Sequence, residues 1–338
     1  MRPFARSASL NLTTVVLAGA LAFHPAPAAS QSAQGRTGTL VVLNKGESTA
    51  TFVDVASGEV LATLPTGQGP HELAMTRDGR RAVSTDYSRG NSLTVFDVEA
   101  LRVERTIDLS AYPSPHGAFF LPGDSILAVS SEASRNVVLV RVADGTVAGA
   151  ISTEAGGSHM VAVTGDGSTL FTGDMQANTV SRLDVASGGK TGSFPVAARP
   201  EAITVSRDGT QVWVGSNDEG TVSVVDPSTG QVTTPLSGFG WPYRILIVES
   251  RDLVVLPDLQ THRVRFVRYS DRSELGRLDF PDEGPQGVAL TADEGTLFLS
   301  LSRAGEVAVI DLSTREVVRR IPVGPTPDGI GWSPLTHR

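Results

Sequence analysis

The sequence repeats itself every 42–45 residues, and this period constrains the fold more than any other feature. Each copy begins with a proline or serine, followed by an apolar run, a turn of the Asp-Gly type, a second apolar run, a third run of the pattern V-x-V-x-D and a final apolar run. The copies open at Pro70, Pro115, Ser158, Pro200, Pro242, Pro285 and Pro327. Four short strands in a period of this length are typical of one β-propeller blade. Two β-sandwiches, the alternative all-β arrangement, would not require equal repeats.

The seventh copy is divided between the two ends of the chain. It opens at Pro327 and stops at Arg338, and residues 37–69 supply the strands that it lacks. A repeat that both termini share closes a ring of blades. The sequence therefore predicts an all-β fold, a seven-bladed β-propeller of four-stranded antiparallel blades. We expect one domain over residues 37–338, closed by pairing N-terminal strands with a C-terminal strand.

Several segments of the repeat match a known consensus. Residues 205–209 read VSRDG and residues 222–230 read VSVVDPSTG, while residues 169–174 and 309–311 match more loosely. On these motifs the chain resembles the YVTN-repeat β-propellers, a mostly bacterial family of exported seven-bladed rings, over residues 37 to about 334. The resemblance implies the fold. It leaves the activity open, because this scaffold carries lactonases, lyases, cyclases and pure binding proteins.

The N-terminus has the pattern of a targeting segment. Arg2 and Arg6 precede a mostly apolar run over residues 10–23, and small residues with prolines follow up to Ser30. This order is typical of a secretory signal peptide, which we assign to residues 1–30. The run is shorter than the roughly 20 residues that a membrane span needs, and an uncleaved anchor is the alternative. We expect an exported protein, periplasmic or extracellular, with no membrane span after cleavage.

Charge and cysteine content exclude several classes of function. The chain has 28 Lys and Arg against 36 Asp and Glu, a formal charge of −8, which argues against nucleic acid and anionic membranes as partners. It has no cysteine. Disulfides, thiolate metal sites and cysteine nucleophiles are therefore excluded.

One repeat position is predicted to line the channel mouth. The first strand of each blade lines the channel of a propeller, and its first residues lie, with the loop after the second strand, on one face that we call the top face. The residue after each repeat opening is His71, His116, His159, Glu201, Tyr243, Gln286 and Asp328. We predict that these residues, together with Arg244, bind a ligand.

The three histidines come from consecutive blades and are predicted to form one sector. Neutral imidazoles of His71, His116 and His159 suit a divalent metal such as zinc. The acids predicted to orient the histidines or to act as a base follow the second strands of the same blades: Asp86, Glu132 and Asp174. A proton-transfer site is one alternative. A solvated polar rim that only reflects the repeat is the other.

Two functions from different classes follow. The first is an exported binding protein that holds a small ligand, a metal or a protein partner at the top face. The second is a metal-dependent enzyme, similar to a lactonase or lyase, that uses the His71, His116 and His159 sector to polarise a carbonyl or activate water. No motif in the sequence decides between them. We expect a monomer in either case.

Overall fold

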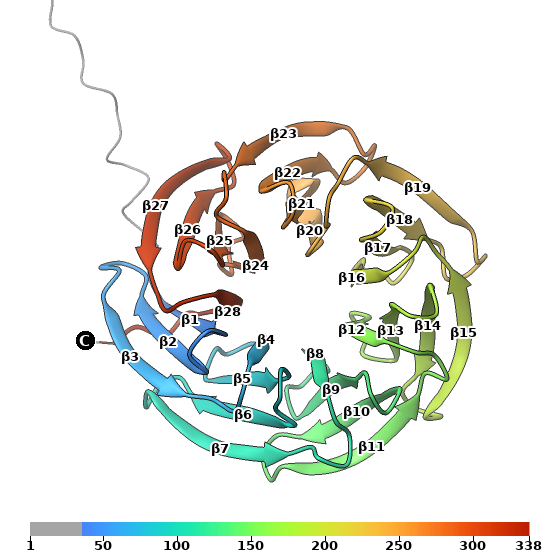
Figure 1. The fold of residues 1–338 in the computed structure, drawn as a ribbon, viewed down its shortest axis with the longest axis horizontal. Coiled ribbons are helices and arrows are strands. Elements are labelled where there is room, and N and C mark those ends of the chain that lie inside the picture. The colour runs from blue at the N-terminus through green and yellow to red at the C-terminus, as the bar shows by residue number, and fades with distance from the viewer. Residues whose placement is uncertain (1–35, 338) are drawn as a thin grey trace, which may run out of the picture. The chain divides into compact units, whose positions relative to one another are not determined.

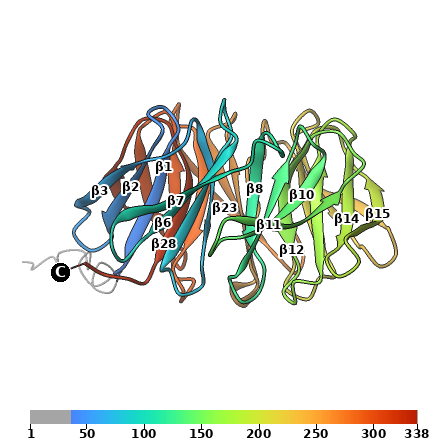
Figure 2. The same ribbon diagram turned by 90° about the horizontal axis from the view of Figure 1, so that it is seen from below.

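The computed structural model describes residues 36–337, whose 28 strands form seven four-stranded antiparallel sheets. The sheets are arranged as blades around a central channel (Figure 1). Seen from the side, the strands run between the two faces of the ring (Figure 2). The predicted seven-bladed β-propeller is therefore confirmed. The predicted signal peptide lies outside the described residues. Within residues 36–337, no helix has the length and apolar character to cross a membrane.

The blades are numbered here from the N-terminus. Blade 1 combines β28 (Pro327–Ser333) with β1 (Thr39–Asn44), β2 (Thr49–Asp54) and β3 (Val60–Pro65). Blade 2 contains β4 (Pro70–Met75), β5 (Arg81–Asp86), β6 (Ser92–Asp97) and β7 (Arg102–Asp108). Blade 3 contains β8 (Pro115–Phe120), β9 (Ile126–Ser131), β10 (Asn136–Arg141) and β11 (Thr146–Ser152). Blade 4 contains β12 (Ser158–Val163), β13 (Thr169–Asp174), β14 (Thr179–Asp184) and β15 (Gly189–Pro195).

The remaining blades follow the same order from the channel outward. Blade 5 contains β16 (Pro200–Val205), β17 (Val212–Ser216), β18 (Thr221–Val225) and β19 (Val232–Ser237). Blade 6 contains β20 (Leu246–Val248), the short helix η1 (Glu249–Arg251), β21 (Leu253–Asp258), β22 (Arg263–Arg268) and β23 (Glu274–Asp279). Blade 7 contains β24 (Pro285–Leu290), β25 (Thr296–Leu301), β26 (Glu306–Asp311) and β27 (Glu316–Pro322).

The apolar core lies between neighbouring blades, because both faces of the inner strands are covered. Val83 and Val95 of blade 2 belong to one buried cluster with Leu127 and Val138 of blade 3. Strands that are buried on both faces need apolar residues on both. This explains why the second and third strands of each repeat read as nearly continuous apolar runs.

The ring closes where the two ends of the chain meet. In blade 1, β28 pairs antiparallel with β1, so that Leu40 faces Trp332 and Val42 faces Ile330. Figure 1 shows the two strands side by side, although they lie at opposite ends of the sequence. The predicted pairing of N-terminal strands with a C-terminal strand is confirmed.

A β-bulge follows the opening residue of the innermost strand in six of the seven blades. In blade 2, Pro70 pairs with Asp86 and Leu73 with Ser84, so His71 and Glu72 together face only Thr85. The hydroxyl of Thr85 accepts a hydrogen bond from the Glu72 N–H at 3.1 Å. A bulge re-aims the side chains of the bulged strand. In these six blades the bulge brings two successive side chains near the channel. In a regular strand, successive side chains point to opposite faces and only one of the two would lie there.

Candidate functional site

The seven ring residues named from the repeat are buried in the structure. Their exposed fractions run from 0% to 8%: His71, His116, His159, Glu201, Tyr243, Gln286 and Asp328. A solvated rim would leave such side chains open to water. The burial therefore disagrees with the solvated-rim alternative, because polar groups at this depth need partners or a ligand.

The three histidines converge, as the register of the repeat predicts. The ring centroids of His71 and His116 are 4.3 Å apart at 88°, and those of His116 and His159 are 3.5 Å apart at 31°. One candidate ligand nitrogen from each ring lies within 4.8 Å of the others. Tetrahedral zinc holds its nitrogen ligands roughly 3.3 Å apart, given Zn–N bonds of about 2.0–2.1 Å.

His116, the central histidine, has no partner for either ring nitrogen among the described residues, although the residue is fully buried. Burial, followed by the charges of His159 and His71, lowers the pKa of His116 well below its usual value. The ring is therefore neutral, with one N–H and one lone pair unsatisfied. A buried orphaned imidazole among two others fits the donor set of a transition metal.

His159 is held by two carboxylates. Its Nδ1 contacts Glu132 Oε1, and its Nε2 lies 3.7 Å from Glu201 Oε1. Burial opposes the charged imidazole, but the hydrogen bonds to Glu132 and Glu201 raise the pKa of His159 to about 9. This pKa favours the protonated imidazole of His159 at neutral pH. The hydroxyl of Tyr87 donates to the other oxygen of Glu132 at 2.6 Å.

His71 has the corresponding arrangement on the other side of His116. Its Nδ1 lies 2.5 Å from Asp328 Oδ2, and Lys45 Nζ lies 2.9 Å from the same nitrogen and 3.1 Å from the same oxygen. The hydroxyl of Tyr243 donates to both oxygens of Asp328, at 3.0 and 3.1 Å. Burial opposes ionisation of Asp328, but the charges of His71 and Lys45 hold its pKa below the usual range. A carboxylate thus contacts Nδ1 of both outer histidines, a common arrangement behind metal-bound histidine. A metal would take Nε2 of His71 and, in place of Glu201, Nε2 of His159.

A buried ion pair crosses the channel beside the histidines. Arg244 of blade 6 contacts the carboxylate of Glu72 of blade 2 and donates to its neighbour's carbonyl, Tyr243 O, at 2.7 Å. The guanidinium also lies 4.2 Å from the centre of the Tyr243 ring. The sequence predicts that Arg244 binds a ligand. In the structure its guanidinium instead pairs with the carboxylate of Glu72.

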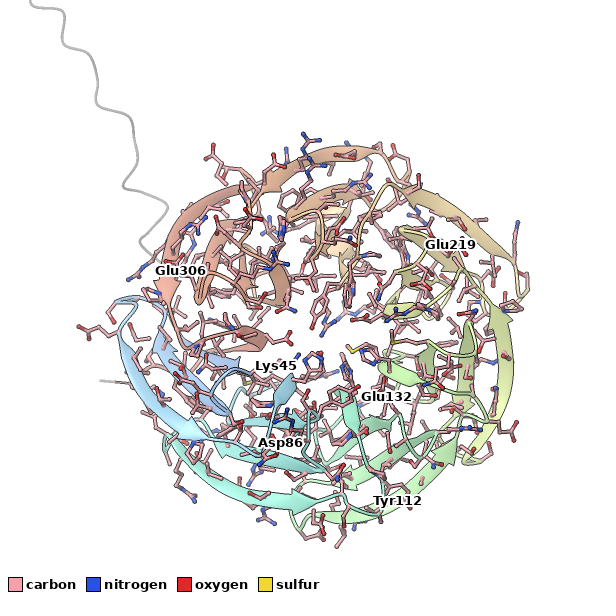
Figure 3. The ribbon with its side chains drawn as sticks, in the orientation of Figure 1. Lys45, Asp86, Tyr112, Glu132, Glu219 and Glu306 are labelled. Carbon is pink, nitrogen blue, oxygen red and sulfur yellow. The ribbon has the colours of Figure 1, made fainter. Side chains whose placement is uncertain are left out.

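Two of the three predicted acids do not reach the histidines. Asp86 accepts hydrogen bonds from Ser84, Ser92 and Thr94, and Asp174 accepts them from hydroxyls of blade 4 in the same way. Figure 3 shows Lys45 and Glu132 beside the channel and Asp86 farther out in its blade. Among the described contacts, only Glu132 of the three acids touches a histidine. We therefore exclude Asp86 and Asp174 from the candidate site.

The reason is a shift of one residue. Asp86 and Asp174 are the last residues of β5 and β13, which pair with the repeat openings, whereas Glu132 is one residue past the end of β9. Successive side chains of a strand point in opposite directions. The residue after the strand end therefore points to the channel. The same offset leads to Lys45 and Tyr87, which the sequence reasoning missed.

A cavity of about 750 Å³ opens above the histidines at the top face. Its lining combines charged, amide and aromatic side chains: Lys45, His71, Tyr87, Glu132, Gly157, His159, Met175, Gln176, Arg199, Glu201, Trp241, Tyr243, Leu259 and Gln286. His116 is not part of this lining. The central histidine therefore lies deeper than the cavity wall, and a molecule in the cavity approaches the cluster from above.

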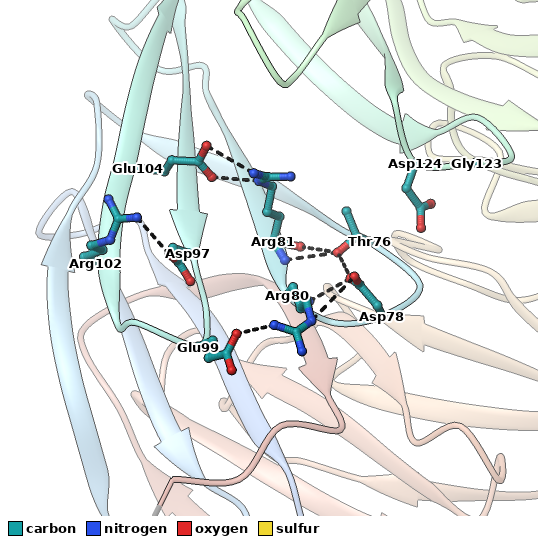
Figure 4. A pocket seen from close by; sticks show the side chains of 10 residues that line it. All are labelled: Thr76, Asp78, Arg80, Arg81, Asp97, Glu99, Arg102, Glu104, Gly123 and Asp124. Atoms are coloured by element: carbon teal, nitrogen blue, oxygen red, sulfur yellow. Dashed lines mark hydrogen bonds and ion pairs between the residues drawn. The ribbon is translucent and has the colours of Figure 1, made fainter.

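A second hollow, of about 470 Å³, lies between blades 2 and 3 away from the channel (Figure 4). Its charged side chains neutralise one another: Arg81 binds Glu104 at 2.7 Å, Arg102 binds Asp97 at 2.9 Å, and Arg80 contacts Glu99. Exposed pairs of this kind contribute little to stability. The hollow offers no unpaired cluster that would require a ligand.

Comparisons with known proteins support the fold. A family model described as a YNCE-like beta-propeller matches residues 123–248. A solved structure, of a functionally unknown protein from Desulfotomaculum acetoxidans DSM 771, superposes with a TM-score of 0.73 at 17% identity, covering 88% of this chain and 99% of that one. No curated protein matches the sequence. The family match covers less than half of the chain; with the ring of seven blades it supports the β-propeller fold, with which the YVTN-repeat resemblance is compatible.

Proposed function

We propose that this propeller is an exported metal-binding protein that holds one divalent transition-metal ion, such as zinc, between His71, His116 and His159. The observation that supports the proposal most directly is His116. It is fully buried, and both of its ring nitrogens lack partners within the described chain. Leaving such a group unsatisfied costs about 1–3 kcal/mol, and a metal ion would take up the unsatisfied lone pair.

The neighbouring residues support the same assignment. Asp328 and Glu132 contact Nδ1 of His71 and His159, and carboxylates in this position fix the ring and make it a better ligand. The chain has no cysteine to supply a thiolate ligand. Histidine nitrogens are therefore the ligands in this chain that best suit zinc or copper. A bound ion would supply Lewis acidity at the floor of the cavity, and the residues around it would set its access to solvent.

Export is the second part of the proposal. Residues 1–30 carry the basic start, apolar run and small residues of a secretory signal peptide. The YVTN-repeat resemblance points to the same compartment. We propose that the mature protein works in the periplasm or outside the cell.

Metal titration tests the central part. The full-length chain is stripped with a chelator and titrated calorimetrically with zinc at about pH 8, where His159, with its pKa raised to about 9, must release a proton when the metal binds. We expect one ion per chain and at least a hundredfold loss of affinity in His116→Gln. His262→Ala is the matched control, because His262 lies in blade 6 outside the cluster. Thermal unfolding shows whether each variant is folded. Absence of zinc and copper uptake by the folded wild type would overturn the proposal.

An enzyme is the second candidate function. The cavity above the histidines supports it, because catalytic zinc sites combine three protein ligands with an open position. We therefore also propose lactone hydrolysis as the activity to assay. Zinc-dependent turnover that His116→Gln abolishes would support the enzyme, and full metal binding without hydrolysis of any lactone tested would leave the binding function alone.

A further inference from the structure

Each carboxylate oxygen of Glu132 and Glu201 in the cavity already faces a protein group. Glu132 is bound by His159 and Tyr87. Glu201 accepts from Asn217 at 2.5 Å and from Trp241 at 3.0 Å through one oxygen, and its other oxygen faces His159. The carboxylates of the cavity wall are therefore already engaged by groups of the protein itself.

The donors of the same cavity have spare capacity. The ammonium of Lys45 carries three protons. It contacts Asp328 and both nitrogens of the His71 ring, and because an imidazole has at most one lone pair to accept a proton, these contacts use at most two. Its side chain is 27% exposed. Arg199, at the rim, faces Asp218 only through Nε at 3.6 Å. A molecule that supplies oxygen acceptors satisfies both cations.

Gln286 adds an independent signal. It is 8% exposed, it lines the cavity, and its Oε1 is buried without a hydrogen-bond partner among the described residues. Buried amide oxygens are normally paired. A hydroxyl or amine group of a molecule in the cavity could donate the missing hydrogen bond to this oxygen.

The size and walls of the cavity fit a small organic molecule. Sites for small molecules occupy about 300–1,000 Å³, and this cavity measures about 750 Å³. Tyr87, Trp241 and Tyr243 supply aromatic surface on its sides. Lys45 Nζ lies 3.4 Å from His71 Nε2, the nitrogen assigned to the metal. A single carboxylate can therefore meet the ammonium and the metal position together.

We propose that the cavity binds a small hydroxycarboxylate, with its carboxylate between Lys45 and the bound metal and its hydroxyl donating to Gln286. This inference rests on the proposed metal site and adds the chemical class of the ligand. Lys45 and Gln286 act here as ligand-binding residues.

Cobalt spectroscopy tests the inference. The full-length protein is saturated with Co(II), whose visible absorption reports its ligands, and is titrated with lactate. Propane-1,2-diol, which has the same carbon skeleton without the carboxylate, is the matched probe. We expect a saturable spectral change with lactate and none with the diol. Lys45→Met at saturating Co(II) should bind lactate at least tenfold more weakly. Lys190→Met is the control, because Lys190 donates to Thr153 O in blade 4, outside the cavity lining.

The outcomes separate the two proposals. Failure to take up Co(II) overturns the metal site and this inference with it. Uptake of Co(II) with no response to lactate, an equal response to the diol, or an equal loss in Lys45→Met and Lys190→Met overturns the hydroxycarboxylate alone and leaves the metal site standing.

Discussion

Asp86 provides a direct test of the one-residue offset that separates blade acids from channel acids. Ser84, Ser92 and Thr94 donate to its carboxylate at 3.2, 2.7 and 2.9 Å, and Ser84 and Thr94 are buried. Asp86→Ala removes the acceptor of two buried hydroxyls. Since each unmatched buried donor costs about 1–3 kcal/mol, we expect the free energy of unfolding to fall by about 2–6 kcal/mol.

Asp86→Asn should lower the free energy of unfolding much less than Asp86→Ala, because another blade already has an asparagine at this position. Asn44 ends β1 at the equivalent position and donates from Nδ2 to Thr49 at 3.0 Å and to Thr51 at 2.7 Å. The hydroxyls of blade 2 can reverse their direction in the same way. We expect Asp86→Asn to lie within about 1 kcal/mol of wild type.

The stability of wild type and that of Asp86→Asn should depend differently on pH. Burial raises the pKa of Asp86, and the hydroxyl hydrogen bonds only partly offset this. The folded protein therefore holds the proton more tightly than the unfolded chain does. The contribution of Asp86 to stability is complete below its unfolded pKa of about 3.9 and is lost as pH rises through the higher folded value. Wild type should thus lose stability relative to Asp86→Asn as pH rises from acid toward neutral.

Urea unfolding followed by tryptophan fluorescence measures these differences, since Trp213 is fully buried. The reasoning is refuted if Asp86→Asn destabilises as much as Asp86→Ala. It is also refuted if the difference between wild type and Asp86→Asn does not change with pH. Loss of zinc binding in folded Asp86→Asn would show that excluding Asp86 from the site was wrong.

Three further predictions concern the ion pair in the channel, the closure of the ring and the signal peptide. Glu72→Gln leaves Arg244 buried without its partner and should lower the free energy of unfolding by about 3–5 kcal/mol. The double variant Glu72→Met with Arg244→Leu should lose less stability than the sum of its two single variants. Additive losses in urea unfolding would contradict the pairing. Deleting residues 327–338 removes β28 from blade 1 and should strongly lower Tm, so an unchanged melting curve would disprove the closure. The exported protein should have a mass that lacks about 30 N-terminal residues, and an intact N-terminus on exported protein would favour the uncleaved anchor.

The sequence by itself determined the number of blades, their closure and the position of the three histidines. A ring of repeats places equivalent residues at equivalent heights, so the offset of His71 from Pro70 carries over to the later blades. The strand pairing of Pro70 with Asp86 and of Pro327 with Asn44 follows the same period. These features depend on local pattern and on counting, which the chain displays directly.

Only the tertiary structure decided which side chains meet at the channel. The direction of a side chain near a strand end reverses with each residue. Asp86 pairs with Pro70, whereas Ser131 pairs with Pro115 and Glu132 comes one residue later, and this one-residue difference decides which acid faces the channel. The bulge after the repeat opening adds Glu72 to the channel, and its partner Arg244 lies 172 residues away. Burial of His116 without a partner is likewise a property of the closed ring. Such contacts arise between blades, where the repeat within each blade holds no information about its neighbours.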